Sequence, residues 1–493
     1  MPTTQTPLPP DALARAASTT LPAQLAERFA QRIQQRLLAA GSRLPSVRSC
    51  ALRHAVSPST VVAAYDLLQA RGLVEARPQR GHFVRDLREP GAVTARSGPE
   101  APGARRLHPA PVDATALIRS MFQAQGGLPA PGMGTLPETW LDAPLLQRAL
   151  RRVCAAPDAW LRYGEPAGSA RLRTALSHRL ADLGVVADRA QIVTTVGATH
   201  ALDLISRTLL QPGDAVLVDE PGWAVEYARL TRMGMRLLPV PRGHTPDGGP
   251  DLTVMQALLK AHKPRLYVTV SVLHNPTGSS LTPAAAHQVL RLAEAHDLTI
   301  VEDDTYAWLA PPHATRLAQL DGLKRTVYVS GFSKILVPQW RVGFLAAAPA
   351  LVERLVDTKL LASLGSPGPL EEAVALCLEQ GSLRRHAERV GTLLAAARAR
   401  TVKLAREAGF VFAAPPAGLF GWVEVGADTE ALAQALLDQG WLTAPGALFH
   451  ATPQPTTLMR VNFATSQDAR FWRQLRQCVA AAGAAHAGTS RHS

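Results

Sequence analysis

Apolar residues near the start of the chain recur with the period of an α-helix. They stand four residues apart, at Leu25, Phe29, Ile33 and Leu37. Because this spacing puts them on one face, it predicts a helix over residues 21–40. Two shorter helices are expected next, one after Ser46 and one after Ser57, since serine caps helix N-termini and Pro58 suits a first helical turn.

Two short apolar runs follow these helices, at residues 73–76 and 82–84, with a polar turn between them. Two helices joined by a tight turn and followed by a β-hairpin are typical of a winged helix-turn-helix. The pattern therefore predicts a small, mostly α-helical domain over residues 21–86. Residues 1–20, which are rich in Thr, Pro and Ala, are expected to form a mobile tail.

Beyond this domain the pattern changes twice. Residues 87–125 contain many Pro and Gly, lack apolar periodicity and are expected to be a linker. From residue 126 on, short apolar runs alternate with helical patterns, which predicts an α/β domain over residues 126–481 with strands buried on both faces. The strands expected there are residues 192–195, 215–218, 266–270, 299–301 and 327–329.

The last part of this α/β domain has a pattern of its own. After residue 380 a helix rich in Ala, Leu and Arg leads into a smaller α+β part. Its strand candidates are residues 421–425 and 458–463. Residues 482–493 are expected to be a frayed tail.

Length and composition agree with this organisation. A chain of 493 residues is too long for one compact core, and its 47% hydrophobic and 18% charged residues are typical of globular domains. The four cysteines are widely spaced, which predicts neither a zinc site nor a disulfide framework. We find no signal sequence and no apolar run of about 18 residues, so we expect no membrane span and a reducing cytoplasm.

The charge of the chain is strongly positive, at +13 with a pI of about 10.2. Such a surplus points to a polyanionic partner or to an arginine-rich genome, and charge alone does not separate the two. Residues 22–86 hold ten arginines against four acidic residues, a surplus of six on a small module. DNA binding needs a surplus of this kind, although a protein-binding winged helix remains the alternative.

The first domain closely resembles the DNA-binding domain of GntR-type bacterial regulators. The matching segments are residues 43–48 (RLPSVR), 57 with 60–61, 64–68, 71–73 and 81–84. This resemblance implies double-stranded DNA as the partner. The contacts that it implies come from Arg43, Ser46, Arg48, Ser59 and Thr60, and from Arg80 and Gly81 in the wing. Pro58 stands where the family often has an arginine, and Gln79-Arg80 replaces a small glycine-rich wing tip, so Arg80 is the better minor-groove or phosphate candidate.

One lysine of the second domain stands out because lysine is scarce in this chain. Only six residues of the chain are lysine. Lys334 follows a strand-like run at residues 326–329 and the short segment Ser330-Gly331-Phe332-Ser333. Arg341 lies seven residues further on. A lysine in a tight Ser/Gly loop with a nearby arginine suits an aldehyde cofactor that carries a phosphate, since the amine forms a Schiff base and the guanidinium holds the phosphate. An ordinary surface lysine is the alternative.

Other polar motifs follow the predicted strands, where open α/β sheets bind ligands. Gly197-Ala198-Thr199 opens a helix and forms an anion cradle, and Trp223 offers an aromatic face. Asn275 sits in a Pro-Gly turn, and Asp303 is followed by Tyr306 three residues later. Each motif is weak alone, because strand-helix turns are often small and polar and a tryptophan more often belongs to a core.

Together these motifs match the needs of pyridoxal phosphate. The cofactor needs a lysine amine, a carboxylate against its ring nitrogen, donors to its phenolate oxygen, an aromatic lid and a phosphate cup. The residues that supply them, in this order, are Lys334, Asp303, Tyr306 with Asn275, Trp223, and Gly197-Ala198-Thr199 with Arg341.

Residues 126–480 accordingly resemble an aminotransferase domain of fold type I, and with the GntR-type head the chain resembles the MocR subfamily of regulators. The resemblance implies a homodimer in which Tyr163 reaches the phosphate of the neighbouring subunit. It also implies that Arg460 grips the α-carboxylate of a substrate or effector, a bidentate task for a guanidinium. Gly331 replaces the Ser or Thr of many relatives, so we expect Ser330 or Ser333 to contact the phosphate instead.

Three functions follow from this resemblance. The first is a transcriptional regulator that senses an amino acid, an amine or pyridoxal phosphate itself. The second is an active aminotransferase, transferring an amino group from an amino acid to a 2-oxo acid, that retains a DNA-binding head. The third is a DNA-binding scaffold whose second domain is inactive. Neither the effector nor the operator can be predicted from the sequence.

Overall fold

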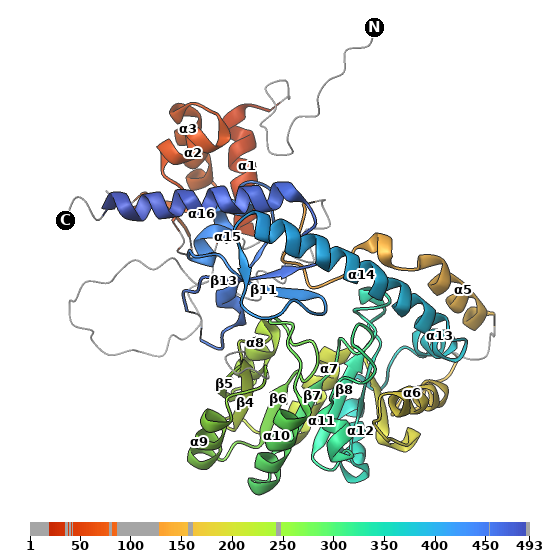
Figure 1. Ribbon diagram of the computed structural model, residues 1–493. Coiled ribbons are helices and arrows are strands. Elements are labelled where there is room, and N and C mark those ends of the chain that lie inside the picture. The colour runs from red at the N-terminus through yellow and green to blue at the C-terminus, as the bar shows by residue number, and fades with distance from the viewer. Residues whose placement is uncertain are drawn as a thin grey trace. The chain divides into compact units, whose positions relative to one another are not determined.

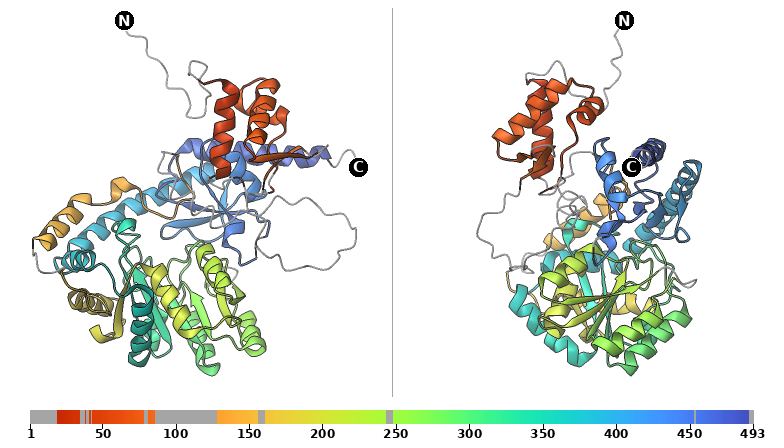
Figure 2. Two further views of the ribbon diagram at one scale, coloured as in Figure 1. Left: turned by 180° about the vertical axis from the view of Figure 1, so that it is seen from behind. Right: turned by 90° about the vertical axis from the view of Figure 1, so that its left-hand side faces the viewer.

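The computed structural model describes residues 19–34, 38, 41, 43–77, 81–85, 128–155, 161–242, 248–452 and 454–489. The predicted linker at 87–125, the wing residue Arg80 and most of the predicted N-terminal tail lie outside these residues. The chain forms two compact units (Figures 1 and 2): residues 1–129 with 434–441, and residues 130–433 with 442–493.

The first unit contains the expected winged helix-turn-helix. Its elements are α1 (Leu21–Gln34), α2 (Val47–His54), α3 (Pro58–Ala70), β1 (Val74–Arg77) and β2 (Gly81–Val84). The side chains of Ser46 and Ser57 accept hydrogen bonds from the backbone N–H groups of Ser49 and Thr60 at 3.2 and 3.1 Å, so both serines cap their helices as predicted. The two strands pair antiparallel and form the hairpin.

Tyr65 ties this small unit together. It is 1% exposed, its ring meets that of Phe29 edge-on with centroids 5.8 Å apart, and its hydroxyl donates to the carbonyl of Pro45 at 2.8 Å. The tyrosine therefore joins α3, α1 and the segment before α2 around one core.

A seven-stranded sheet forms the centre of the second unit. Its strand order is β3-β9-β8-β7-β6-β4-β5. The strands from β5 to β8 run parallel, and β9 runs antiparallel to both β3 and β8. The strands are β3 (Ile192–Thr195), β4 (Ala215–Glu220), β5 (Arg236–Pro241), β6 (Leu266–Thr269), β7 (Thr299–Asp303), β8 (Thr326–Gly331) and β9 (Gly343–Ala346).

Helices cover both faces of this sheet (Figures 1 and 2). Alternate residues of β4 show why: Val216 and Val218 pack with α7, α8 and α12, whereas Ala215 and Leu217 pack with α9 to α11 on the other face. Such two-sided burial produces the continuous apolar strands of the sequence. The helices are α5 (Ala143–Cys154), α6 (Ala170–Asp182), α7 (Ala198–Leu209), α8 (Ala224–Arg232), α9 (Leu252–His262), α10 (Pro283–Ala295), α11 (Leu317–Asp321), α12 (Pro349–Ser363) and α13 (Gly368–Glu379).

The expected smaller part follows the long helix α14 (Ser382–Glu407). Its four-stranded sheet contains β10 (Val411–Phe412), β11 (Phe420–Glu424), β13 (Leu458–Asn462) and β12 (Ala444–Pro445), in this order. Helix α15 (Thr429–Leu437) precedes β12. Helix α16 (Ala469–Thr489) runs past residue 482, where we had predicted the C-terminal tail to begin.

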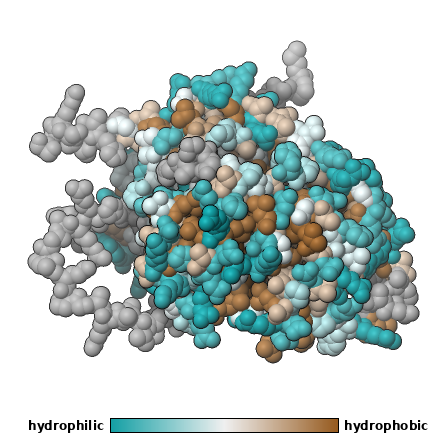
Figure 3. All heavy atoms as spheres, turned by 60° about the horizontal axis from the view of Figure 1, so that its bottom comes forward, coloured by the Kyte–Doolittle hydropathy of each residue, from teal (hydrophilic) through white to brown (hydrophobic). Residues whose placement is uncertain are grey.

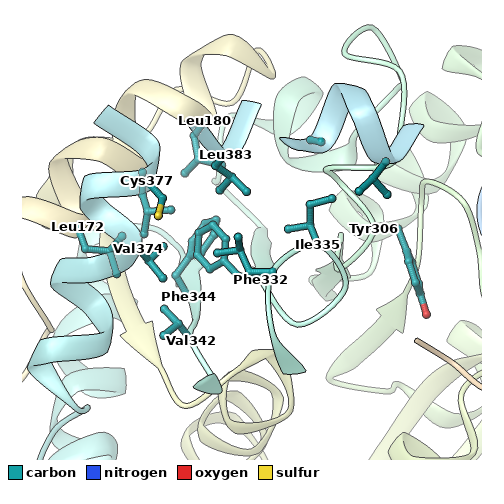
Figure 4. Packing of buried hydrophobic residues seen from close by; sticks show 14 of the residues in the cluster. Leu172, Leu180, Tyr306, Phe332, Ile335, Val342, Phe344, Val374, Cys377 and Leu383 are labelled. Atoms are coloured by element: carbon teal, nitrogen blue, oxygen red, sulfur yellow. The ribbon is translucent and has the colours of Figure 1, made fainter. Parts of the chain in front are cut away.

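The fold positions the loop of Lys334 through its neighbours in the sequence. Phe332 and Ile335 are 2% and 0% exposed, and Figure 4 shows both pointing into an apolar core that they share with Phe344, Val374 and other residues. With its neighbours fixed in the core, the lysine is held at the end of β8. No described helix combines the length and the hydrophobicity needed to cross a membrane.

Phe332→Ala should lower the free energy of unfolding by about 3–5 kcal/mol, because it removes a fully buried ring and leaves a cavity. Val186→Ala, at a position that is 80% exposed, is the control and should change it by less than about 0.5 kcal/mol. Urea denaturation of both variants measures the difference. A loss below about 1 kcal/mol for Phe332→Ala would show that this core does not hold the loop.

Candidate functional site

Lys334 lies at the centre of a buried polar site. Its Nζ donates to the carbonyl oxygen of Gly134 at 2.8 Å. Burial lowers the pKa of this amine from 10.5 to about 8; the Arg460 and Arg341 cations lower it further, and the Asp303 carboxylate opposes them. A lysine with this pKa loses its proton readily near neutral pH and becomes a nucleophile.

Asp303 ends β7 and is held by Thr305. The backbone N–H of Thr305 donates to Oδ1 at 3.0 Å, and its hydroxyl donates to the same oxygen. Burial raises the pKa of Asp303 to about 6, and the nearby carboxylates of Glu226 and Asp304 also raise it. The hydrogen bonds from Thr305 act in the opposite direction and lower this pKa. A cationic N–H partner would stabilise the ionised form of a carboxyl in this environment.

Tyr306, three residues later, is 6% exposed and meets the ring of Phe420 edge-on, with centroids 5.6 Å apart. Burial raises the pKa of its hydroxyl well above the ordinary value, although the Arg460 cation opposes this shift. The phenol therefore keeps its proton and serves as a hydrogen-bond donor.

Arg460 reaches the same site from β13. Its Nη1 donates to Oδ1 of Asn275 at 2.9 Å, and its Nη2 donates to the carbonyl of Gly132 at 2.6 Å. The guanidinium carbon lies 4.5 and 4.8 Å from the ring centroids of Phe420 and Phe449. Burial lowers its pKa to about 10, and its Nε is buried with no hydrogen-bond partner. A buried cation with an unused donor is prepared to bind a carboxylate.

The residues predicted to form a phosphate cup lie at the N-terminus of α7. Gly197 has a φ of +77°, and a Cβ there would lie 2.4 Å from Nη2 of Arg341, so only glycine fits beside the guanidinium. Nη1 of Arg341 donates to Oγ of Ser333 at 2.9 Å. The hydroxyl of Ser330 instead donates to the carbonyl of Asp304 at 2.8 Å. Of the two predicted serines, Ser333 is therefore the one beside the cup.

A cavity lies beside these groups at the carboxyl ends of β4, β6 and β7. Trp223, Asn275 and Asp303 all line it, so three residues predicted from separate strands meet around one space. Ala198 and Thr199 occupy the first turn of α7, where backbone N–H groups are free to bind an anion. Tyr163 is 92% exposed and does not line this cavity of its own chain.

Several groups of the site were not predicted. Phe420 and Phe449 face Arg460, and the carbonyls of Gly132 and Gly134 accept hydrogen bonds from Arg460 and Lys334. The glycines of the run Pro131-Gly132-Met133-Gly134 were the available signal, because adjacent small residues often mark a close approach of backbone. The two phenylalanines carried no signal that separated them from core residues.

The predicted DNA-binding side chains lie on the first unit. Arg43, Ser46, Arg48 and Ser59 are exposed, and Thr60 and Gly81 are half-buried. Arg43 forms a backbone bridge with Phe83 of the hairpin, and its guanidinium lies against Gly81. These contacts bring Arg43 next to the wing.

The fold and the two sites define a class of protein: a winged helix-turn-helix DNA-binding head fused to an aminotransferase-fold domain. The model of the aminotransferase class I and II family matches residues 135–473, and that of the bacterial regulatory proteins of the gntR family matches residues 21–84. The chain belongs to the aminotransferase class I and II family and, with its head, to the MocR subfamily of GntR-type transcriptional regulators.

Similar proteins include regulators and enzymes. The chain is 29% identical to the HTH-type transcriptional regulator YdcR of Escherichia coli, over 92% of this chain and 97% of that protein. It is 30% identical to the probable rhizopine catabolism regulatory protein MocR of Rhizobium meliloti, over 78% and 76%. It is also 30% identical to a 2-aminoadipate transaminase of Thermus thermophilus, over 69% and 84%.

Among solved structures, the chain is similar to LysN, an α-aminoadipate aminotransferase of Thermus thermophilus complexed with a phosphopyridoxyl-leucine. The TM-score is 0.68 at 25% identity, over 75% of this chain and 95% of that one. The residues of the site also fit pyridoxal phosphate: an amine of lowered pKa, a buried carboxyl and an arginine against a glycine cup. Pyridoxal phosphate is the cofactor of this family and of this domain.

Cofactor capture should depend on pH through Lys334. The capture rate should rise about tenfold per pH unit below about pH 8 and level off above it, because only the neutral amine reacts. Mixing the cofactor-free protein with pyridoxal phosphate and following visible absorbance measures this rate. Lys334→Ala should show no such change in visible absorbance. A capture rate that still rose tenfold per pH unit above pH 9 would indicate an ordinary exposed lysine.

Proposed function

We propose that the protein is a pyridoxal-phosphate-dependent transcriptional regulator that binds an amino acid or amine in its aminotransferase-like domain and DNA through its head. The observation that carries this proposal is the arrangement of Arg460 beside Lys334. Both side chains approach Gly134, whose added Cβ would lie 3.7 Å from the lysine Nζ and 3.9 Å from the arginine Nη2. An amine and a carboxylate of one small molecule would meet these two groups together.

Each residue has a role in holding the cofactor. Lys334 would supply the amine that anchors its aldehyde, and the Asp303 carboxylate would hold the proton of its ring nitrogen. Tyr306 and Asn275 would bind its phenolate oxygen, and Trp223 would cover its ring. Its phosphate would be held by Gly197, Ala198, Thr199, Ser333 and Arg341. When bound, the cofactor supplies an aldehyde for exchange with amines and an electron sink.

Effector binding would act on the segment at residues 130–135, near the start of the aminotransferase-like domain. Lys334 and Arg460 donate to the carbonyls of Gly134 and Gly132. The side-chain amide of Asn462 donates to the carbonyls of Met133 and Thr135, both at 2.8 Å. We refer to this set of hydrogen bonds as the clasp.

The clasp lies between the site and the chain that leads to the head. A carboxylate bound by Arg460 would compete with the Gly132 carbonyl for the same Nη2, so effector binding would weaken the clasp. In the proposed regulator, a shift between clasped and released states would be the change in this domain that accompanies a change in DNA binding.

We also propose that two chains form a homodimer in which Tyr163 contacts the phosphate of the other subunit. Its 92% exposure leaves it free for a partner, and Leu361 is exposed to the same extent. Figure 3 shows apolar side chains gathered among hydrophilic ones on one face of the molecule. The same proposal includes the domain limits at residues 21–86 and 126–481. It also includes a place in the cytoplasm beside DNA.

DNA binding should be specific and sensitive to salt. The DNA next to the protein's own gene should shift in a gel, and Arg48→Ala should weaken binding and lower the slope of log K against log salt by about one, because one phosphate contact is lost. Arg385→Ala, an exposed arginine of α14, is the control and should leave both unchanged. Equal affinity for unrelated DNA would contradict the proposed regulator.

An active aminotransferase remains the second candidate, because Lys334 can also move a proton once its amine is free. With amino acids and 2-oxoglutarate, the regulator should give slow or no turnover, while amines that bind should still change the absorbance of the bound cofactor. Sustained turnover at rates of about 1 s⁻¹ or more would favour the enzyme. An unchanged regulatory response in Lys334→Ala would favour a scaffold with an inactive domain.

A further inference from the structure

A buried carboxylate beside the site has no role in the function proposed so far. Glu226 lies in the first turn of α8, three residues after Trp223, and is 4% exposed. Burying a carboxylate is costly unless it is paired. Its position therefore requires both a partner and an explanation.

Glu226 lines the same cavity as Asp303 and Trp223. Two carboxylates, one from α8 and one from β7, thus border one cavity next to the cofactor residues. Because both face the same space, each would affect the proton affinity of any group that binds there. In agreement, the charge of Glu226 contributes to the raised pKa of Asp303.

Arg229 neutralises Glu226 through an ion pair within α8. Its Nη2 and Nε donate to Oε1 and Oε2 at 2.5 and 3.0 Å, a bidentate pair. Nη2 also donates to Oγ of Ser206 on α7 at 3.0 Å, and Nη1 lies 3.7 Å from Oδ1 of Asp203. The pair thereby links α8, which begins at Trp223, to the helix that forms the phosphate cup.

Other charged and titratable groups surround this pair. The cavity is also lined by Asp219, Tyr227 and His274, and Arg242 donates to Asp219 at 2.9 Å. Asp219 is offset by this arginine and by hydrogen bonds from Tyr267 and Thr269, and burial keeps the pKa of His274 well below its ordinary value. Glu226 differs from Asp219 because the arginine that balances its charge, Arg229, lies on the same helix, α8.

We propose that Glu226 is a positioning residue of the cofactor site. Its carboxylate, fixed and balanced by Arg229, sets the charge around Asp303 and so determines how firmly the ring nitrogen and the Lys334 nitrogen of the loaded protein hold their protons. This inference rests on the proposed cofactor site. A purely structural tie between α7 and α8 is the competing explanation.

The full-length protein loaded with pyridoxal phosphate distinguishes the two explanations through the pH midpoint of its visible absorption. Glu226→Gln removes a negative charge and should move the midpoint down by about half a pH unit or more. Arg229→Gln leaves the carboxylate uncompensated and should move it up. Glu226→Asp, which keeps the charge, and the exposed control Glu353→Gln should stay close to the parent value.

Opposite shifts from the two halves of one ion pair are the signature of a charge effect. A structural tie would weaken cofactor retention in both variants without opposite shifts. No shift in Glu226→Gln, or shifts of the same sign in both variants, would overturn the inference. Should Glu226→Gln fail to fold, Arg229→Gln decides alone: an upward shift supports the inference, and no shift or a downward one overturns it. Absence of the band from the parent protein would instead refute the proposed cofactor site.

Discussion

The cost of burying charge determines the chemistry of the second unit. Arg460 is buried and Lys334 and Asp303 are half-buried, and the pKa of each moves toward neutrality, to about 10, 8 and 6. None of the three has a full ionic partner within the described residues; backbone carbonyls, an amide and a threonine form hydrogen bonds with them instead, and Nε of Arg460 has no partner. Such a site gains stability when a ligand brings the missing charges, which is the physical basis of its affinity for a small zwitterion.

The parts of the fold with strong local signals could be predicted from the sequence. Strands β3, β4, β6, β7 and β8 were predicted, and they are apolar because helices cover both faces of the sheet. Strand β5 was missed because its two prolines, Pro239 and Pro241, argue against a strand, yet it lies at the edge of the sheet, where proline is tolerated. Strand β9 was missed because two of its four residues, Gly343 and Ala346, are of types that are depleted in strands.

The residues of the site likewise fall into those that could be predicted from the sequence and those that could not. Lys334, Asp303 and Tyr306 could be found because their chemical types recur at fixed places after strands. Asn275 was also predicted as a site residue, but the hydrogen bonds that Arg460 donates to Asn275 and to the Gly132 carbonyl were not. Both partners lie far from Arg460 in the chain, and only the fold brings them together. The choice between Ser330 and Ser333 likewise depends on which way each side chain points at the end of β8.

The clasp at residues 130–135 would also act on effector binding, because thermodynamic coupling between two sites is reciprocal. If a bound effector weakens the hydrogen bond from Arg460 to Gly132, any event that holds the segment in its released state must strengthen effector binding by the same factor. If operator DNA favours that released state, it would be an allosteric ligand of the amino-acid site. The nucleic acid would adjust the sensitivity of its own sensor, and the effector concentration needed for a response would differ between free and promoter-bound protein.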